Sequence, residues 1–215
     1  FDPEEVQSDA EFDQFDGLRV VTVATVNPLK GLEDFIDMAT AVTRRVSQNV
    51  RFFIVGPIYE SQKRYGEELK KQVKELDADN IYFTGRSDNV PGILKAADLY
   101  VCSSKFEASP ISVWEAMSMA LPIVSTDVGD IRDFLENEDS LAGSVVEVGN
   151  ADDMAEQVIH FLNHPSERKR AGRKAREIAK NELNIDVCVH KHHRIYSEVL
   201  GVPDTYAKTV GVRTS

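Results

Sequence analysis

The chain has 215 residues, of which 42% are apolar and 28% charged, and its formal net charge is −11 at pH 7. This size and composition predict one globular domain with a core large enough to fold without disulfides. The sequence contains no apolar run of about 20 residues that could span a membrane. The acidic balance argues against a nucleic-acid partner and against attraction to anionic lipid through overall charge.

The cysteines and the first residues bear on the compartment and on the extent of the chain. Cys102 and Cys188 do not make a disulfide framework and fit a reducing compartment, and with no visible signal peptide we expect a cytoplasmic protein. The chain opens with Phe1 rather than Met, so we expect it to begin inside a longer protein. Residues 4–17 are acidic and weakly patterned, which predicts a linker or a loosely attached first turn.

Strands and helices alternate from residue 18 onward. Strands are predicted at 19–25, 51–55, 80–84, 98–102, 122–125 and 143–148. Helices are predicted from the Asn-Pro-Leu-Lys-Gly break at 27–31 to about 45, and at 60–76, 88–97, 131–135, 151–162, 166–180 and 185–200. This rhythm predicts an α/β fold, a doubly wound parallel sheet covered on both faces, with C-terminal helices. We interpret the charge-rich helix at 60–76 as a solvated face.

The stretch 100–128 carries the candidate chemistry. An apolar strand opens there into a polar loop, and a further helix is predicted to begin with Ser109 as N-cap and Pro110 as its first residue. The free N–H groups of Ile111 and Ser112 would then face the loop. They lie at the positive end of the helix dipole, which favours an anion.

Glu115 is the single carboxylate in this otherwise apolar helix. A buried carboxylate needs a partner, and hydroxyl groups of a ligand would supply one. Glu115 lies about 6 Å along the axis from the N–H of Ile111, about the offset between a phosphate and the ribose attached to it. A structural reading stays open, because Ser112 and Glu115 also spell a capping box and Glu107 alone fits a solvated loop carboxylate.

The two glutamates and their surroundings resemble a known family. Residues 107–115 read Glu-Ala-Ser-Pro-Ile-Ser-Val-Trp-Glu, which resembles the E-x7-E signature of retaining glycosyltransferases of the GT-B type, in particular family 4 (group 1). The run from Leu121 to Gly129 is similar to the segment that follows the second glutamate in that family. Phe1 to Pro3 resembles the ending of the motif at which the first domain of these enzymes passes to the second.

The resemblance implies the Rossmann-like C-terminal half of a GT-B fold, with strand order 3-2-1-4-5-6 and a ligand crevice at the ends of strands 1 and 4. It implies a linker at 1–17 from a missing N-terminal domain, a donor-binding domain at 18–200 and a tail at 201–215. The implied activity moves a sugar from a UDP- or GDP-linked donor to an acceptor hydroxyl. The acceptor site would lie on the missing domain, through which we also expect any peripheral membrane association, so the fragment alone should be inactive.

Lys30 and Glu107 are the catalytic candidates. Lys30 and Gly31 resemble the family's Lys-Gly pair, whose lysine binds the donor diphosphate. This role is physically reasonable, because a fixed ammonium stabilises the charge that grows on the diphosphate as the glycosidic bond breaks. Glu107 would contact hydroxyls of the donor sugar. The alternative for Lys30 is a surface lysine at a helix start, where a cation is slightly unfavourable.

The resemblance also assigns a set of donor-binding residues. These are Thr25, Gly31, Gly85, Arg86, Val90, Ser109, Pro110, Ile111, Ser112 and Glu115. The amides of Ile111 and Ser112 would lie near phosphate or sugar, Glu115 would bind the ribose, and the 85–90 loop would face the base. Arg86 fits a solvated or ion-paired surface residue equally well. Thr25 stands where many relatives have an arginine directed at the diphosphate, and Ala108 and Asp130 replace common glycines.

No metal or cofactor is expected, because Lys30 and the helix amides would replace a cation. The histidines at 190, 192 and 193 are spaced two and three apart rather than i, i+4, and no carboxylate partner is evident, so they do not predict a metal site.

Two other function classes remain open. One is a nucleotide-sugar epimerase of the same architecture, which the E-x7-E pair and the following Leu121-Pro122 disfavour. The other is a non-catalytic nucleotide-binding or interaction module, which would have no reason to keep Glu107 and Lys30. A phosphorylatable receiver domain fails, because Thr25 and Gly56 stand where it needs acidic groups.

Overall fold

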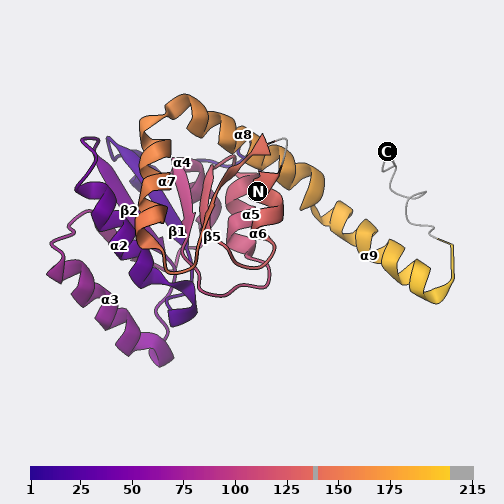
Figure 1. Ribbon diagram of the computed structural model, residues 1–215, viewed down its shortest axis with the longest axis horizontal. Coiled ribbons are helices and arrows are strands. Elements are labelled where there is room, and N and C mark those ends of the chain that lie inside the picture. The colour runs from indigo at the N-terminus through magenta and orange to yellow at the C-terminus, as the bar shows by residue number, and fades with distance from the viewer. Residues whose placement is uncertain (138–139, 204–215) are drawn as a thin grey trace. The chain divides into compact units, whose positions relative to one another are not determined.

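The computed structural model describes residues 1–137 and 140–203, and its contacts divide the chain into two units, Phe1–Arg176 and Glu177–Ser215. The centre of the first unit is a six-stranded sheet of order β3-β2-β1-β4-β5-β8, in which every neighbouring pair is parallel (Figure 1). Its strands are β1 Leu18–Val23, β2 Val50–Val55, β3 Ile81–Gly85, β4 Leu99–Cys102, β5 Ile123–Thr126 and β8 Gly143–Val146. The predicted fold class and strand order are confirmed.

The helices follow the predicted alternation closely. They are α2 Leu32–Thr43, α3 Lys63–Glu75, α4 Val90–Ala96, α5 Ile111–Ser118, α6 Ile131–Leu135, α7 Ala151–Asn163, α8 Pro165–Glu182 and α9 Ile185–Leu200. Single 3-10 turns, η1 Pro28–Lys30 and η2 Glu60–Gln62, precede α2 and α3.

The core lies on both faces of the sheet. On one face α2, α3 and α7 pack with β1 and β2, and α2 lies beside α7 (Figure 1). Phe35 of α2 and Phe52 of β2 make an edge-to-face ring contact there, with centroids 6.2 Å apart. On the other face α4 and α5 pack against β1, β4 and β5. Every residue of β4 and β5 is buried, which explains why these strands read as apolar runs without alternation.

The topology fixes where a ligand crevice forms. The chain runs outward from β1 through β2 to β3, then returns to the centre and runs the other way through β4 and β5 to β8. The winding therefore reverses between β1 and β4, and the loops that follow these two strands turn away from each other. Those loops leave an opening at the carboxyl edge of the sheet.

Three short elements were not predicted. They are α1 Ala10–Asp13 and the antiparallel pair β6 Glu136–Asn137 and β7 Ser140–Leu141. A two-residue strand is too short to show alternation, and a four-residue helix makes little more than one turn, so neither gives a hydrophobic period.

The first residues are held more firmly than the sequence pattern indicates. The Phe12 ring lies 4.5 Å from the Phe53 ring, and the Arg19 guanidinium donates to the carbonyl oxygens of Phe12 and Phe15, both at 2.7 Å.

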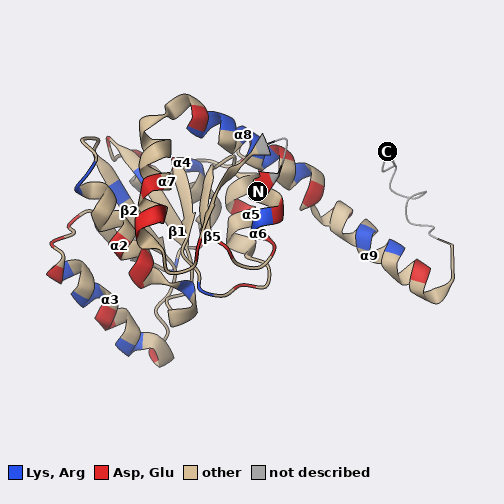
Figure 2. Ribbon diagram, viewed as in Figure 1, with Lys and Arg blue, Asp and Glu red and all other residues tan. Residues whose placement is uncertain are grey.

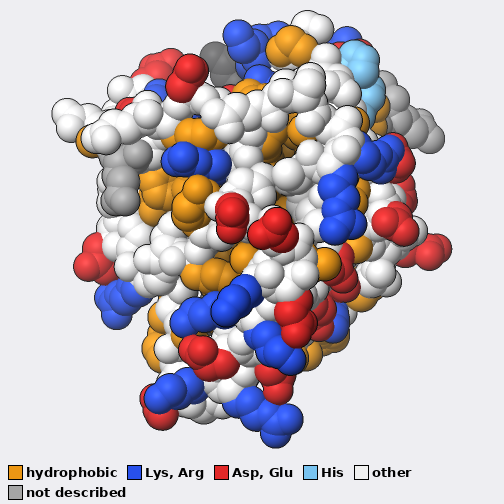
Figure 3. All heavy atoms as spheres, turned by 90° about the vertical axis from the view of Figure 1, so that its left-hand side faces the viewer, with side chains coloured by type: hydrophobic (Ala, Val, Ile, Leu, Met, Phe, Trp, Pro, Cys, Tyr) orange, Lys and Arg blue, Asp and Glu red, His pale blue; other side chains and the backbone are white. Residues whose placement is uncertain are grey.

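The charge-rich helix α3 is largely exposed to solvent, as predicted. Ion pairs at helical spacing join Arg64 to Glu68 and Lys71 to Glu75, and Figure 3 shows Lys/Arg and Asp/Glu side chains alternating over this lower part of the molecule. Lys and Arg predominate along α8 (Figure 2). Within the described residues, no helix is long and apolar enough to cross a membrane.

The second unit contains α9. The Asn184 side chain accepts hydrogen bonds from the N–H groups of Asp186 and Val187, and Gly201 ends the helix in a left-handed conformation. Of the predicted tail at 201–215, residues 204–215 lie outside the described part of the chain.

Candidate functional site

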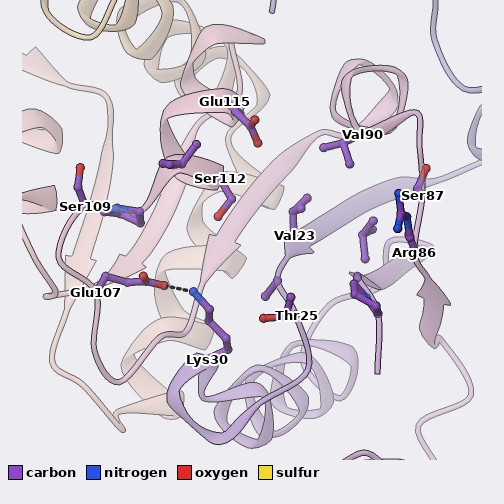
Figure 4. A pocket seen from close by; sticks show the side chains of 16 residues that line it. Val23, Thr25, Lys30, Arg86, Ser87, Val90, Glu107, Ser109, Ser112 and Glu115 are labelled. Carbon is purple, nitrogen blue, oxygen red and sulfur yellow. Dashed lines mark hydrogen bonds and ion pairs between the residues drawn. The ribbon is translucent and has the colours of Figure 1, made fainter. Parts of the chain in front are cut away.

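A cavity of about 440 Å³ lies at the carboxyl ends of β1, β2 and β4, where the winding reverses (Figure 4). Ten predicted site residues line it: Thr25, Lys30, Arg86, Val90, Glu107, Ser109, Pro110, Ile111, Ser112 and Glu115. Gly31 and Gly85, which were also predicted, do not line it. The structure therefore brings side chains from three separate chain segments, those that follow β1, β3 and β4, into one cavity.

Lys30 and Glu107 form an ion pair at one side of the cavity. The Lys30 Nζ atom lies 2.6 Å from Glu107 Oε1, the ion pair drawn in Figure 4. The Lys30 side chain is 26% exposed and the Glu107 side chain 15% exposed, so the pair is partly shielded from water. A charge-assisted hydrogen bond of this length fixes both groups. The ammonium and the carboxylate are thus held together before any ligand arrives.

The backbone conformation at position 31 requires a glycine after Lys30. Its φ is 56°, in the left-handed region, and a Cβ atom there would lie 2.1 Å from the carbonyl oxygen of Ser103. Only glycine permits both this conformation and this approach. The contact brings the end of η1 against the end of β4, and so places Lys30 beside the loop that carries Glu107.

The start of α5 corrects one prediction. Pro110 has ψ 91°, which is not helical, so Pro110 is the N-cap and Ile111 is the first helical residue. Ser109 does not cap the helix, because its Oγ accepts a hydrogen bond from the Trp114 indole at 3.0 Å. The N–H groups of Ile111 and Ser112 still have no intrahelical acceptor. The predicted anion site therefore keeps its two amides, with a different cap.

Glu115 lies one turn further along α5 and points into the cavity (Figure 4). Among the described residues its side chain has no hydrogen bond or ion pair. Burial raises the pKa of its carboxyl group, and the charge of the N-terminal ammonium of Phe1 offsets part of this rise. The capping-box reading is wrong, because α5 already begins at Ile111 and Ser112 lies inside it. The carboxylate is consequently free to accept hydrogen bonds from a ligand.

Tyr100 supports the floor of the cavity and was missed from the sequence. Its hydroxyl accepts from the Val23 N–H at 3.3 Å and lies close to the Ser112 side chain. Burial raises its pKa, so the phenol stays neutral. Tyr100 thus joins the end of β1 to the start of α5. An aromatic residue inside an apolar strand gives no sequence signal for such a role.

The remaining lining residues that the sequence missed lie at or just after strand ends. They are Val23, Ala24, Val55, Gly56, Pro57 and Ser87. The Gly56 N–H donates to the Gly85 carbonyl at 2.9 Å, which joins the ends of β2 and β3. Gly85 shapes this junction with a φ of 73°. The rule that residues after parallel strands line the crevice could have found Gly56 and Pro57.

Arg86 lies on the side of the cavity away from Glu107, and Thr25 lies between Lys30 and Arg86 (Figure 4). Arg86 pairs with Asp88 at 3.3 Å and its side chain is 76% exposed, so this ion pair contributes little to stability. Both readings of Arg86 therefore hold, because its side chain lines the cavity and also forms a surface ion pair. Thr25 accepts a hydrogen bond from Asn27 at 3.3 Å and brings no positive charge.

The segment after α5 packs on the loop that carries Glu107. Gly129 has φ 58°, and a Cβ atom there would lie 2.5 Å from the carbonyl oxygen of Ala108. Asp130, in place of the family's common second glycine, stands at the N-cap of α6 but makes no capping hydrogen bond with its side chain. The close approach of Gly129 to Ala108 thus holds the segment after α5 against the loop that carries Glu107.

Neither cysteine is in a disulfide, and burial raises the pKa of the Cys102 thiol. In the part of the chain that the structure describes, no group of three or more His, Cys, Asp or Glu side chains is arranged to hold a metal ion. In the histidine cluster, His192 Nδ1 lies 2.8 Å from the Cys188 carbonyl oxygen, one turn back in α9.

Comparison with known proteins identifies relatives. The family model described as "Glycosyl transferases group 1" matches residues 7–178. N-acetyl-alpha-D-glucosaminyl L-malate synthase of Bacillus anthracis is 25% identical over 182 residues, which cover 84% of this chain and 45% of that protein. Alpha-D-kanosaminyltransferase of Streptomyces kanamyceticus is 26% identical, with the same two coverages. The chain therefore spans about half the length of the curated relatives it matches.

Solved structures share the fold. Anabaena Alr3699/HepE in complex with UDP superposes with a TM-score of 0.77 at 20% identity, covering 94% of this chain and 56% of that one. Sucrose-phosphate synthase from Thermosynechococcus elongatus has a TM-score of 0.76 at 19% identity, covering 94% and 51%. At these identities the likeness concerns the fold alone.

Proposed function

The chain belongs to the group 1 glycosyl transferase family, and from this we propose that it binds the nucleotide-sugar donor of a retaining glycosyltransferase. The proposed reaction moves a sugar from a nucleotide diphosphate to an acceptor hydroxyl. The observation that carries the proposal is the Lys30–Glu107 pair, 2.6 Å long, in one cavity with the start of α5 and Glu115. The Lys30 cation and the two free amides suit the diphosphate of such a donor, and the Glu115 carboxylate suits the hydroxyls of its ribose.

The diphosphate is assigned to Lys30 and the N–H groups of Ile111 and Ser112. These groups lie on the Glu107 side of the cavity and carry positive charge or partial positive charge. The helix dipole strengthens the attraction of the two amides for an anion. As the bond between sugar and diphosphate breaks, negative charge grows on the diphosphate, and fixed donors stabilise that change. Because Thr25 replaces the usual arginine, Lys30 carries more of this task than in many relatives.

The sugar is assigned to Glu107. Its Oε1 atom is engaged by Lys30, so the sugar would lie next to the diphosphate that Lys30 contacts. Carboxylate oxygens accept hydrogen bonds from sugar hydroxyls and orient the anomeric carbon.

The ribose and the base are assigned to the rest of the cavity. The unpartnered Glu115 accepts hydrogen bonds from the two ribose hydroxyls, which offsets the cost of its burial. The base then lies toward Arg86, Ser87 and Val90. The Anabaena relative was solved with UDP and with UDP-glucose, which makes uridine nucleotides the first probes to use.

Acceptor binding and completed transfer are proposed to need a further domain, because the chain covers 45% of its curated relatives. We therefore expect donor binding by the chain alone, with little or no transfer.

Calorimetric titration with UDP, GDP and ADP tests the proposal. The chain is expected to bind one of the three selectively, and Lys30→Ala and Glu115→Ala are each expected to weaken that binding about ten-fold. Lys71→Ala is the matched control, because Lys71 is an exposed lysine of α3 paired only with Glu75 among the described residues. Failure of all three nucleotides to bind, or equal binding by all four proteins, contradicts the proposal.

A further inference from the structure

Two neighbouring serines follow β4 directly and lie behind the Lys30–Glu107 pair. Ser103 is 1% exposed and Ser104 4% exposed. Neither lines the cavity. A buried hydroxyl must find a hydrogen-bond partner, and the partners of these two are specific.

Ser104 holds the catalytic carboxylate. Its Oγ donates to Glu107 Oε1 at 2.8 Å, the same oxygen that Lys30 Nζ reaches at 2.6 Å. Ser104 is itself anchored, because its carbonyl oxygen accepts a 2.6 Å hydrogen bond from Oγ1 of Thr126, a fully buried residue of β5. The orientation of Glu107 is therefore tied to the centre of the sheet.

Ser103 holds the backbone of the catalytic lysine. Its Oγ donates to the Lys30 carbonyl oxygen at 2.9 Å. The carbonyl oxygen of Ser103 lies only 2.1 Å from the position that a Cβ atom on Gly31 would take. The main chain of Lys30 and Gly31 is thus fixed on Ser103 by a hydrogen bond and by close packing.

We propose that Ser103 and Ser104 are positioning residues with separate tasks, Ser103 for the diphosphate-binding lysine and Ser104 for the sugar-binding glutamate. The inference rests on the proposed function. When a donor enters, the Lys30 ammonium turns from Glu107 to the diphosphate and Oε1 loses that partner. Ser104 then supplies the hydrogen bond that keeps the Glu107 carboxylate directed at the sugar.

The two tasks predict different binding defects. Calorimetry would compare UDP, GDP and ADP with UDP-glucose, GDP-mannose and ADP-glucose. Ser104→Ala is expected to weaken the sugar donor about ten-fold and leave the nucleotide diphosphate unchanged, because it removes a hydrogen bond to a charged group that only the sugar uses. Ser103→Ala is expected to weaken both ligands by the same factor.

Three further variants separate positioning from general damage. Ser104→Thr keeps the hydroxyl and is expected to restore sugar-donor affinity. Thr126→Val removes the anchor of Ser104 and is expected to give a smaller defect of the same selective kind, which serves if Ser104→Ala does not fold. Ser125→Ala is the control, because Ser125 is a fully buried serine of β5 whose hydroxyl bonds to the Thr126 carbonyl and reaches neither catalytic residue.

Equal weakening of sugar donor and nucleotide by Ser104→Ala, or the same defect in Ser125→Ala, overturns the positioning role and leaves the proposed function standing. A wild-type chain that binds none of the nucleotides and sugar donors overturns the proposed function, and the positioning role with it.

Discussion

Glu115 is the residue whose ionisation bears most directly on ligand binding. Burial raises the pKa of its carboxyl group in the free chain. Ribose hydroxyls that donate to the carboxylate favour the charged form and lower this pKa, so nucleotide binding releases a proton from Glu115. The affinity is therefore full above the raised pKa and falls as the pH is lowered through it.

Calorimetry at several pH values between about 8 and 4 measures this loss, since an unperturbed glutamate titrates near the lower end of that range. The terminal phosphate of the nucleotide also titrates in this range and needs a control. In Glu115→Gln the carboxylate is absent and only the phosphate contribution remains, so the pH dependence should be shallower than in the wild type. Identical profiles for the two proteins would rule out a carboxylate that titrates with binding.

Single residues differ in how far the sequence reveals them. Glu115 could be predicted, because a lone carboxylate in an apolar helix has few structural explanations. Ser103 and Ser104 could not, since their hydrogen bonds depend on the loop geometry after β4 and serines are common in loops. Ser109 was assigned the wrong task, because its hydroxyl is engaged by Trp114 from the next turn of the helix.

Among the elements, the junction of η1 with α2 is closely constrained at Gly31. Gly31→Ala places a Cβ atom 2.1 Å from a backbone oxygen and also strains a φ of 56°. Gly149 offers a matched control, because its φ is 80° and a Cβ atom there meets nothing within 4 Å. We expect Gly149→Ala to cost about 1 kcal/mol of unfolding free energy through strain alone, and Gly31→Ala to cost about 3 kcal/mol or more.

Urea unfolding followed by Trp114 fluorescence measures both costs, since Trp114 is the single tryptophan of the chain. A larger shift of the midpoint for Gly31→Ala is expected. Equal shifts would mean that the close approach of Gly31 to Ser103 does not constrain the folded state.

Elements long enough to show a period were located from the sequence to within a few residues, as for α9 at Ile185–Leu200. The start of α5 was misplaced by one residue, because the ψ of Pro110 is set by the loop before it and not by its residue type. The strand order β3-β2-β1-β4-β5-β8 needed the family resemblance, since periodicity identifies strands but does not pair them.

For the molecule as a whole, the positive charge that binds the diphosphate is proposed to come from the protein. Lys30 and two helix amides would take the place of a divalent cation. The affinity for the preferred nucleotide should therefore be the same in EDTA as in millimolar magnesium chloride. A loss of binding in EDTA, restored by the metal, would contradict this prediction and require carboxylate ligands for the ion.

The central claim, that the cavity between Lys30, Glu107 and the start of α5 holds the nucleotide diphosphate, is tested most directly by NMR titration of the 15N-labelled chain with UDP. The largest amide shifts are predicted at Lys30, Ile111 and Ser112, which line the cavity at the assigned phosphate position. Shifts that instead gather around Arg51 and Tyr82, which line the separate aromatic cavity on β2 and β3, would place the nucleotide elsewhere and contradict the account.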